Sequence, residues 1–304
     1  MTQDVLHSDP ASVKAGELEI VYDAFGKASA PPILLIMGLG EQMIAWDEEF
    51  CAALAGRGYW VIRFDNRDVG LSTKFDEAGI PDILAMMQGK PSQAPYTLRD
   101  MAADAVGLLD ALQIESAHVV GISMGGMIAQ EMAICYPERV WTLTSIMSST
   151  GDPTLPPPRP EAAALLITPA PTDRDGYLEH SVQTWRVLNG PGFPLDEERI
   201  RERAGRSFDR GPSPAGAMRQ LAAILASESR KEVLKTLKVP TLVIHGDADP
   251  LVPVECGVDT ADAIPGTELL IIEGMGHDLP PAVEPQVIDA IVRHATEITR
   301  IDQV

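Results

Sequence analysis

One serine lies in a glycine-rich stretch between a predicted strand and a predicted helix. Ser123 stands in G-I-S-M-G, with Gly121 and Gly125 two residues before and after it. An apolar run covers 117–123 and a helical pattern covers 124–136. A serine on a sharp strand-to-helix turn has a strained backbone and needs small neighbours, and the helix N-terminus behind it favours a developing oxyanion. Ser123 is therefore the candidate catalytic nucleophile.

A serine hydroxyl attacks a carbonyl only when a base takes its proton. His277, in E-G-M-G-H, follows the last predicted strand on a glycine-rich loop. Sites in open α/β sheets form at the carboxyl ends of the strands, so His277 is the candidate base. The remaining histidines lie near the chain ends, at a strand start, in a helical stretch or at a turn that they are expected to shape: His7, His294, His118, His180 and His245.

The base needs a carboxylate that orients its ring. The stretch V-I-H-G-D-A-D-P leaves a predicted strand with two candidates, Asp247 and Asp249. We favour Asp249, which lies deeper in the loop and ahead of Pro250. Asp247 is the alternative, and its other expected role is to bind backbone amides in the turn. The order Ser, Asp, His along the chain is that of α/β-hydrolases.

An oxyanion hole needs two hydrogen-bond donors. The residue after the nucleophile supplies one, the backbone N–H of Met124. The loop after the first buried strand, M-G-L-G, is expected to supply the other. Gly38 permits a sharp turn there, so we assign the second donor to the backbone N–H of Leu39, with Gly40 as the weaker choice.

A substrate pocket is expected beside these loops, where apolar and small residues gather. Flexible methionine side chains suit a pocket that accepts varied acyl groups, although core filling is the alternative for each of them. The residues assigned to the pocket are Gly38, Met43, Met127, Trp185 and Met275.

Alternating apolar runs and amphipathic patterns predict an α/β fold with a mostly parallel sheet and helices on both faces. The predicted strands lie within 17–26, 31–38, 59–65, 117–123, 139–149, 239–253 and 267–277. The predicted core helices are 46–58, 97–114 with Thr97 as N-cap, 124–136 and 285–298.

The alternation stops between residues 150 and 230. This stretch is rich in proline and then in helical patterns at 177–190, 196–208 and 215–227. We therefore predict a hydrolase-like core in 1–149 and 231–304, interrupted by a helical cap in 150–230. The irregular stretch 74–95 is expected to cover the site together with this cap. Ten of the 17 arginines fall between Arg159 and Arg230; we expect them on solvated helix faces paired with glutamates, the alternative being attraction of an acidic substrate.

The bulk composition narrows the class of protein. The chain has 304 residues, 45% hydrophobic content and a formal net charge of −20, which disfavours nucleic acid and anionic membranes as partners. Three widely spaced cysteines fit a reducing compartment. Neither a signal peptide pattern nor a membrane-spanning apolar run is recognised, so we expect a cytoplasmic protein. The expected oligomeric state is a monomer or a homodimer.

Over nearly its whole length the chain resembles the α/β-hydrolase superfamily. The resemblance rests on five stretches, at 37–40, 65–72, 121–126, 245–253 and 274–277. Within the superfamily the chain looks most similar to carboxylesterases and to aclacinomycin methylesterase-like hydrolases. The resemblance implies a Ser–His–Asp ester hydrolase with a helical cap.

Two positions depart from the superfamily pattern. Met37 precedes Gly38 where many members have histidine, which keeps the backbone donor but removes a polar group near the hole. Asp68 stands where many relatives have glycine in a D-x-R-G turn. Asp65 and Arg67 of that turn are expected to have a structural ion-pair role.

The expected activity is hydrolysis of small to medium or aromatic carboxylic esters through an acyl-enzyme, with no metal or organic cofactor. Ser123 argues against epoxide hydrolase and dehalogenase chemistry, which uses a carboxylate nucleophile. Two alternatives stay open: carbon–carbon bond hydrolysis or peracid formation on the same triad, and a non-catalytic ligand receptor on a hydrolase fold.

Overall fold

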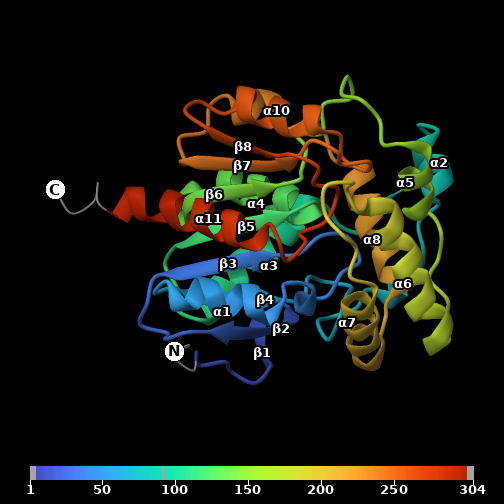
Figure 1. Cartoon of the computed structure of the whole chain (residues 1–304), viewed down its shortest axis with the longest axis horizontal. Helices are drawn as coiled ribbons and strands as arrows, with labels where there is room; N and C mark the ends of the chain where they lie inside the picture. The colour runs from blue at the N-terminus through green and yellow to red at the C-terminus, as the bar shows by residue number, and fades with distance from the viewer. Residues whose placement is uncertain (1–4, 91–92, 300–304) are drawn as a thin grey trace.

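The computed structural model describes residues 5–90 and 93–299, and a single sheet runs through its centre (Figure 1). The strand order is β1-β2-β4-β3-β5-β6-β7-β8. β2 pairs antiparallel with β1 and β4, and all other neighbours are parallel. The strands are β1 (Ala11–Ala15), β2 (Leu18–Phe25), β3 (Pro32–Ile36), β4 (Trp60–Phe64), β5 (Ala117–Ile122), β6 (Val140–Ile146), β7 (Thr241–Gly246) and β8 (Glu268–Ile272).

Helices cover both faces of the sheet, as predicted. Every residue of β3 is buried, because Leu34 and Ile36 face one core and Ile33 and Leu35 face the other. The first core contains side chains of α3 (Leu98–Ala111) and α4 (Met124–Cys135). The second contains side chains of α1 (Glu48–Gly56) and α11 (Glu284–Thr299). Thr97 caps α3 in a reciprocal capping box with Asp100.

Between β6 and β7, the regular secondary structure of the described residues is entirely helical. They are α5 (Pro160–Leu165), α6 (Arg174–Leu188), α7 (Glu197–Arg210), α8 (Pro214–Leu225) and the short α9 (Lys231–Leu234). Helices α5–α8 gather at one end of the sheet together with α2 (Ile83–Met87), which comes from the predicted roof stretch 74–95 (Figure 1). Ile83 packs there against Leu221 and Ala222 of α8. Pro91 and Ser92 of that stretch lie outside the described residues.

Several elements were not predicted. The edge strand β1 is largely exposed and lacks an apolar run. Helices α5 and α9 are short, and α10 (Val254–Ala263) is modestly apolar. Packing rather than sequence pattern stabilises such elements. None of the described helices has the length and apolar character needed to cross a lipid bilayer.

Candidate active site

Ser123 occupies a strained turn between β5 and α4. Its φ of 54° and ψ of −121° lie in a region that non-glycine residues rarely adopt. A Cβ atom on Gly121 would lie 2.0 Å from the carbonyl oxygen of Gly125, and one on Gly125 would lie 2.1 Å from that of Ile36. Only glycine fits either position, so these two residues permit the turn that holds the serine hydroxyl out of the sheet.

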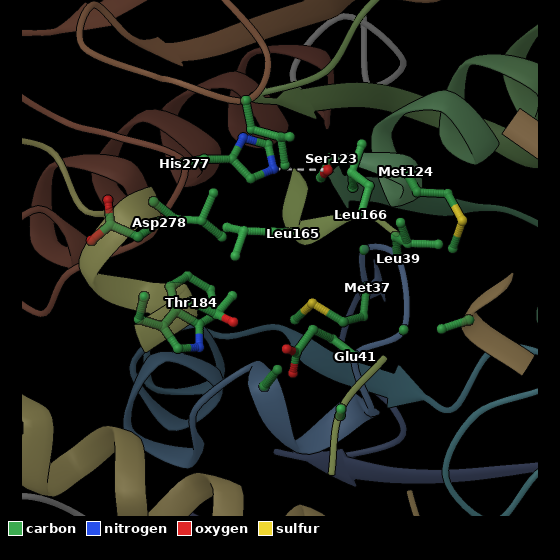
Figure 2. Close-up of a pocket in the computed structure, with 18 of the residues that line it drawn as sticks. Met37, Leu39, Glu41, Ser123, Met124, Leu165, Leu166, Thr184, His277 and Asp278 are labelled. Atoms are coloured by element: carbon green, nitrogen blue, oxygen red, sulfur yellow. Dashed lines mark hydrogen bonds between the residues drawn. The ribbon is translucent and has the colours of Figure 1, made fainter. Parts of the chain in front are cut away.

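The structure brings Ser123, His277 and Asp249 together from three separate loops at the ends of parallel strands. The Nε2 atom of His277 lies 2.9 Å from the Oγ of Ser123, as Figure 2 shows. The Nδ1 atom of His277 lies 2.7 Å from the Oδ2 of Asp249. His277 and Asp249 are both buried. This arrangement can pass the serine proton to the histidine while the carboxylate stabilises the charged ring.

The Asp249 carboxylate is held in its ionised form. Its Oδ1 accepts hydrogen bonds from the backbone N–H groups of Leu251 and Val252, both at 2.8 Å. Burial alone would raise the pKa of Asp249, but the positive charge on His277 and hydrogen bonds with His245 and His277 lower it well below its usual range. The carboxylate is therefore available to orient His277 near neutral pH.

Asp247 has a different task from Asp249. Its Oδ1 accepts the backbone N–H of Gly274 at 2.7 Å, which ties the loop after β7 to the loop that carries His277. His245 lies in the same region, fully buried, with its Nε2 atom 2.8 Å from the carbonyl oxygen of Val252. That contact fits the turn-shaping role expected for His245.

The two candidate oxyanion donors belong to segments that lie next to the nucleophile. A Cβ atom on Gly38 would lie 3.3 Å from the Cβ of Ser123, so the loop after β3 passes directly beside the serine. Among the described residues, neither Leu39 nor Met124 donates its backbone N–H to a protein acceptor. The N–H of Gly40 is already donated to the Oε1 of Gln220 at 2.8 Å, which disfavours that alternative.

A cavity of about 830 Å³ opens above Ser123 and His277. Its floor comes from the loops after β3, β5, β7 and β8, and its roof comes from α2 and α5–α8. Most of the wall is apolar, with Leu165, Leu166 and Met37 among the side chains drawn in Figure 2. A cavity of this size can hold a drug-sized ligand.

Three of the five residues assigned to the pocket line this cavity: Gly38, Met127 and Trp185. Met43 and Met275 do not, and their assignment is corrected. Met43 is fully buried in a short 3-10 helix (Met43–Ala45) and packs against Val21. Met275 is fully buried beneath the histidine loop, in the core cluster on the α1 and α11 face. Loop position alone did not show which way these side chains point.

The arginines of α7 and α8 have a role that the sequence did not reveal. Arg199 lies 2.6 Å from Asp47, at the start of α1, and 3.3 Å from Glu284, at the start of α11. Others pair on the helix surface as expected, such as Arg201 with Glu197 at 3.1 Å. Part of the arginine-rich stretch therefore attaches α7 to the ends of α1 and α11.

The turn 65–72 binds two of these arginines, and both Asp65 and Arg67, for which an ion-pair role is expected, form ion pairs with residues outside the turn. Arg67 pairs with Asp104 at 2.6 Å, whereas Asp65 pairs with Arg210 of α7. Asp68, with a φ of 74°, forms two hydrogen bonds with Arg219 of α8 at 2.7 and 2.9 Å. Burial acts to raise the pKa of Asp68, but hydrogen bonds from Arg219, the Phe75 backbone and Tyr96 together outweigh it, so the pKa of Asp68 is lowered.

The family model of the alpha/beta hydrolase fold matches residues 31–280. The chain belongs to the α/β-hydrolase family. It is 34% identical over 309 residues to rhodomycin D methylesterase DauP of Streptomyces sp. (strain C5), covering 93% of this chain and 97% of that protein. It is 32% identical over 303 residues to rhodomycin D methylesterase DnrP of Streptomyces peucetius, with the same coverage of 93% and 97%.

A solved structure has the same fold. The meta-cleavage product hydrolase CumD of Pseudomonas fluorescens IP01 superposes on this α/β-hydrolase with a TM-score of 0.73. The two are 22% identical, and the match covers 94% of this chain and 97% of that one. At this identity the likeness supports the fold alone.

Proposed function

We propose that this α/β-hydrolase is a serine carboxylesterase with Ser123 as nucleophile, His277 as base and Asp249 as the orienting acid. The observation that carries the proposal is the unbroken relay of hydrogen bonds from Asp249 through His277 to Ser123, beneath a mostly apolar cavity. Similarity to two methylesterases supports the same reaction class.

The proposed reaction has two halves. Ser123 attacks the ester carbonyl as His277 takes its proton, and the N–H groups of Leu39 and Met124 bind the oxyanion. His277 then protonates the leaving alcohol. Water, deprotonated by His277, then attacks the acyl-enzyme carbonyl; the bond to Ser123 breaks as His277 returns the proton to the serine oxygen, and the acid is released. Asp249 stays ionised throughout, as its lowered pKa favours.

We further propose that α5–α8, within residues 150–230, form a cap over the two-part core of 1–149 and 231–304. Leu165, Tyr177, Arg203 and Met218 of these helices all line the cavity. The size of the cavity favours an ester with a bulky acid part, and the names of the relatives favour a small alcohol such as methanol. The expected protein is a cytoplasmic monomer or homodimer.

A substrate panel tests the proposal. Purified protein is given methyl and p-nitrophenyl esters of acids from acetate to fused aromatic carboxylates, and separately vinylogous diketones. We expect ester turnover that rises with the size of the acid, and a fluorophosphonate should label Ser123 at one equivalent. Cleavage of the diketones without ester turnover would instead favour carbon–carbon hydrolysis, and no turnover at all would favour a receptor.

A further inference from the structure

We propose that Gln220 of α8 is a positioning residue for the reaction: its side chain holds the backbone donor Leu39 in place, so that the oxyanion hole is complete only while α8 lies over the loop after β3. The inference rests on the proposed esterase function, because an oxyanion hole acts only in such a reaction. It adds a side chain that touches neither the substrate nor the triad to those on which the rate depends.

Gln220 links the loop after β3 to the turn 65–72. Its side chain is fully buried. The Oε1 atom accepts the backbone N–H of Gly40 at 2.8 Å, and the Nε2 atom donates to the carbonyl oxygen of Arg67 at 2.8 Å. One partner is a donor and the other is an acceptor, so only one orientation of the amide satisfies both. The side chain therefore binds the loop with a defined geometry.

The hydrogen bond to Gly40 restrains the peptide unit directly after Leu39. The N–H of Gly40 belongs to the unit between residues 39 and 40, and the N–H of Leu39 belongs to the unit before it. The side chain of Leu39 also packs against the small apolar cluster that contains Leu221 and Ala222 of α8. Helix α8 therefore restrains Leu39 through both its side chain and the peptide that follows it.

Helix α8 also approaches the backbone of the loop closely. Gly40 has a φ of 72°, and a Cβ atom there would lie 3.2 Å from the Cβ of Ala217. Glycine adopts many backbone conformations at little cost, so residue 40 has little intrinsic preference for this one. The contact with α8 and the hydrogen bond to Gln220 are therefore needed to select the observed conformation.

Both ends of the loop are attached to the sheet core. The Nδ2 atom of Asn66 donates to the carbonyl oxygen of Met37 at 3.0 Å. The Oδ1 atom of Asp65 accepts the backbone N–H of Met43 at 2.8 Å. The oxyanion donor lies between these two attachment points. Loss of Gln220 should therefore shift the donor and leave the ends of the loop in position.

A shifted donor should slow the reaction more than it weakens substrate binding. A donor in an oxyanion hole stabilises the charge that develops in the transition state, and it must point to the place that this oxygen then occupies. Outright removal of one such donor typically lowers kcat by about 10²–10³-fold. Displacement of Leu39 should cost less, about 10–100-fold.

The test uses Gln220→Met, which removes the amide and keeps an unbranched side chain of similar length. A fluorophosphonate is the probe. The Oγ of Ser123 forms a bond to phosphorus as His277 takes its proton, fluoride leaves, and the phosphoryl oxygen occupies the oxyanion hole. We expect the second-order rate constant of labelling to fall about 10–100-fold. For a methyl ester, kcat and kcat/KM should fall equally, with KM changed less than about threefold.

A matched control comes from a second buried glutamine. Gln130 of α4 is also fully buried, and its amide forms hydrogen bonds with Ser145 at 3.3 Å and Arg230 at 2.9 Å. Gln130→Met should lower the melting temperature and change the labelling rate less than about threefold. A similar loss of labelling in both variants would overturn the role of Gln220, because it would show an effect of destabilisation alone.

Conservative variants add two independent readouts. Gln220→Glu keeps an acceptor oxygen for the N–H of Gly40 and should retain most of the labelling rate, whereas the shorter Gln220→Asn should not. This pair gives the same comparison if Gln220→Met does not fold. The pH of half-maximal labelling should be equal in wild type and Gln220→Met, since Gln220 bonds to the loop and the turn. A changed midpoint would indicate a disturbed His277 and would overturn the proposal.

The labelling experiment separates this inference from the esterase proposal. If wild-type protein is labelled at Ser123 but hydrolyses no ester, the esterase proposal fails, and the ratio of labelling rates still decides the role of Gln220. If wild type hydrolyses esters and Gln220→Met is labelled equally fast, only the role of Gln220 is rejected. Wild-type protein that is neither labelled nor active would reject both.

Discussion

The backbone N–H of His277 donates a hydrogen bond to the carbonyl oxygen of Leu188 at 2.8 Å. Leu188 is the last residue of α6, so the histidine loop is attached directly to the helices that roof the cavity. Glycines make this approach possible: a Cβ atom on Gly276 would lie 2.2 Å from the same Leu188 oxygen. The position of His277 therefore depends on how α6 and the other helices over the cavity are placed.

Gly190→Ala should impair catalysis although residue 190 is not in the triad. A Cβ atom there would lie 2.1 Å from the carbonyl oxygen of Gly274 and would push the histidine loop away from α6. Displacement of the base by a fraction of an ångström should lower kcat about tenfold or more. Gly56→Ala, at a position with open space around it, is the control. Full activity in Gly190→Ala would show that the loop is positioned independently.

Ser123→Ala should abolish ester turnover while the fold remains. The expected loss in kcat is at least about a thousandfold, because the attacking atom is removed. Steady-state kinetics measure the loss, and circular dichroism with thermal melting checks folding. Ser227→Ala, which removes a hydroxyl just beyond α8 that donates to the Ala223 backbone oxygen, should retain activity. A Ser123→Ala variant with near-full turnover would identify a different nucleophile.

Asp249→Asn and Asp247→Asn should differ strongly. The first replaces the partner of His277 with a neutral amide, and we expect a loss in kcat of about 10³–10⁴-fold. The second can still accept the N–H of Gly274 through its amide oxygen, so the loss should stay within about tenfold. Parallel kinetics on one ester compare them. A larger loss for Asp247→Asn would reverse the assignment.

Arg219→Ala should destabilise the protein. Arg219 and Asp68 are almost fully buried, so the variant leaves an unpaired carboxylate in the interior. Breaking a buried pair typically costs about 3–5 kcal/mol of unfolding free energy. Urea denaturation measures the change. Arg201→Ala, which breaks an exposed pair with Glu197, should cost less than about 1 kcal/mol. Equal effects from the two variants would contradict a special contribution of the buried Arg219–Asp68 pair to stability.

Asp278 should make stability depend on pH. Burial raises the pKa of Asp278 to about 6. Because the folded state binds this proton more tightly than the unfolded chain, the stabilising contribution is full below pH of about 4 and is lost as the pH rises through 6. The free energy of unfolding of Asp278→Asn should therefore exceed that of wild type by about 1–3 kcal/mol at pH 8, and by little at pH 4. Chemical denaturation at both pH values measures this, with exposed Asp9→Asn as control. A gain of equal size at both pH values would exclude titration of Asp278.

Local sequence patterns determined most of the catalytic framework. The glycines around Ser123 are dictated by backbone geometry within five residues. His277 and Asp249 each follow a strand whose carboxyl end is readable from its apolar run, although the edge strand before His277 is mostly exposed in the structure. Parallel strands place those ends at one edge of the sheet, so their proximity could be predicted without a model of the loops.

Side-chain direction in irregular segments was decided only by the tertiary structure. Met43 and Met275 lie beside the site in sequence, yet packing against the core turns both away from the cavity. Asp68 and Arg219 are 151 residues apart, and no local pattern links them. Contacts between distant segments arise from the three-dimensional packing of the whole chain, whereas turn geometry and strand ends are fixed by a few adjacent residues.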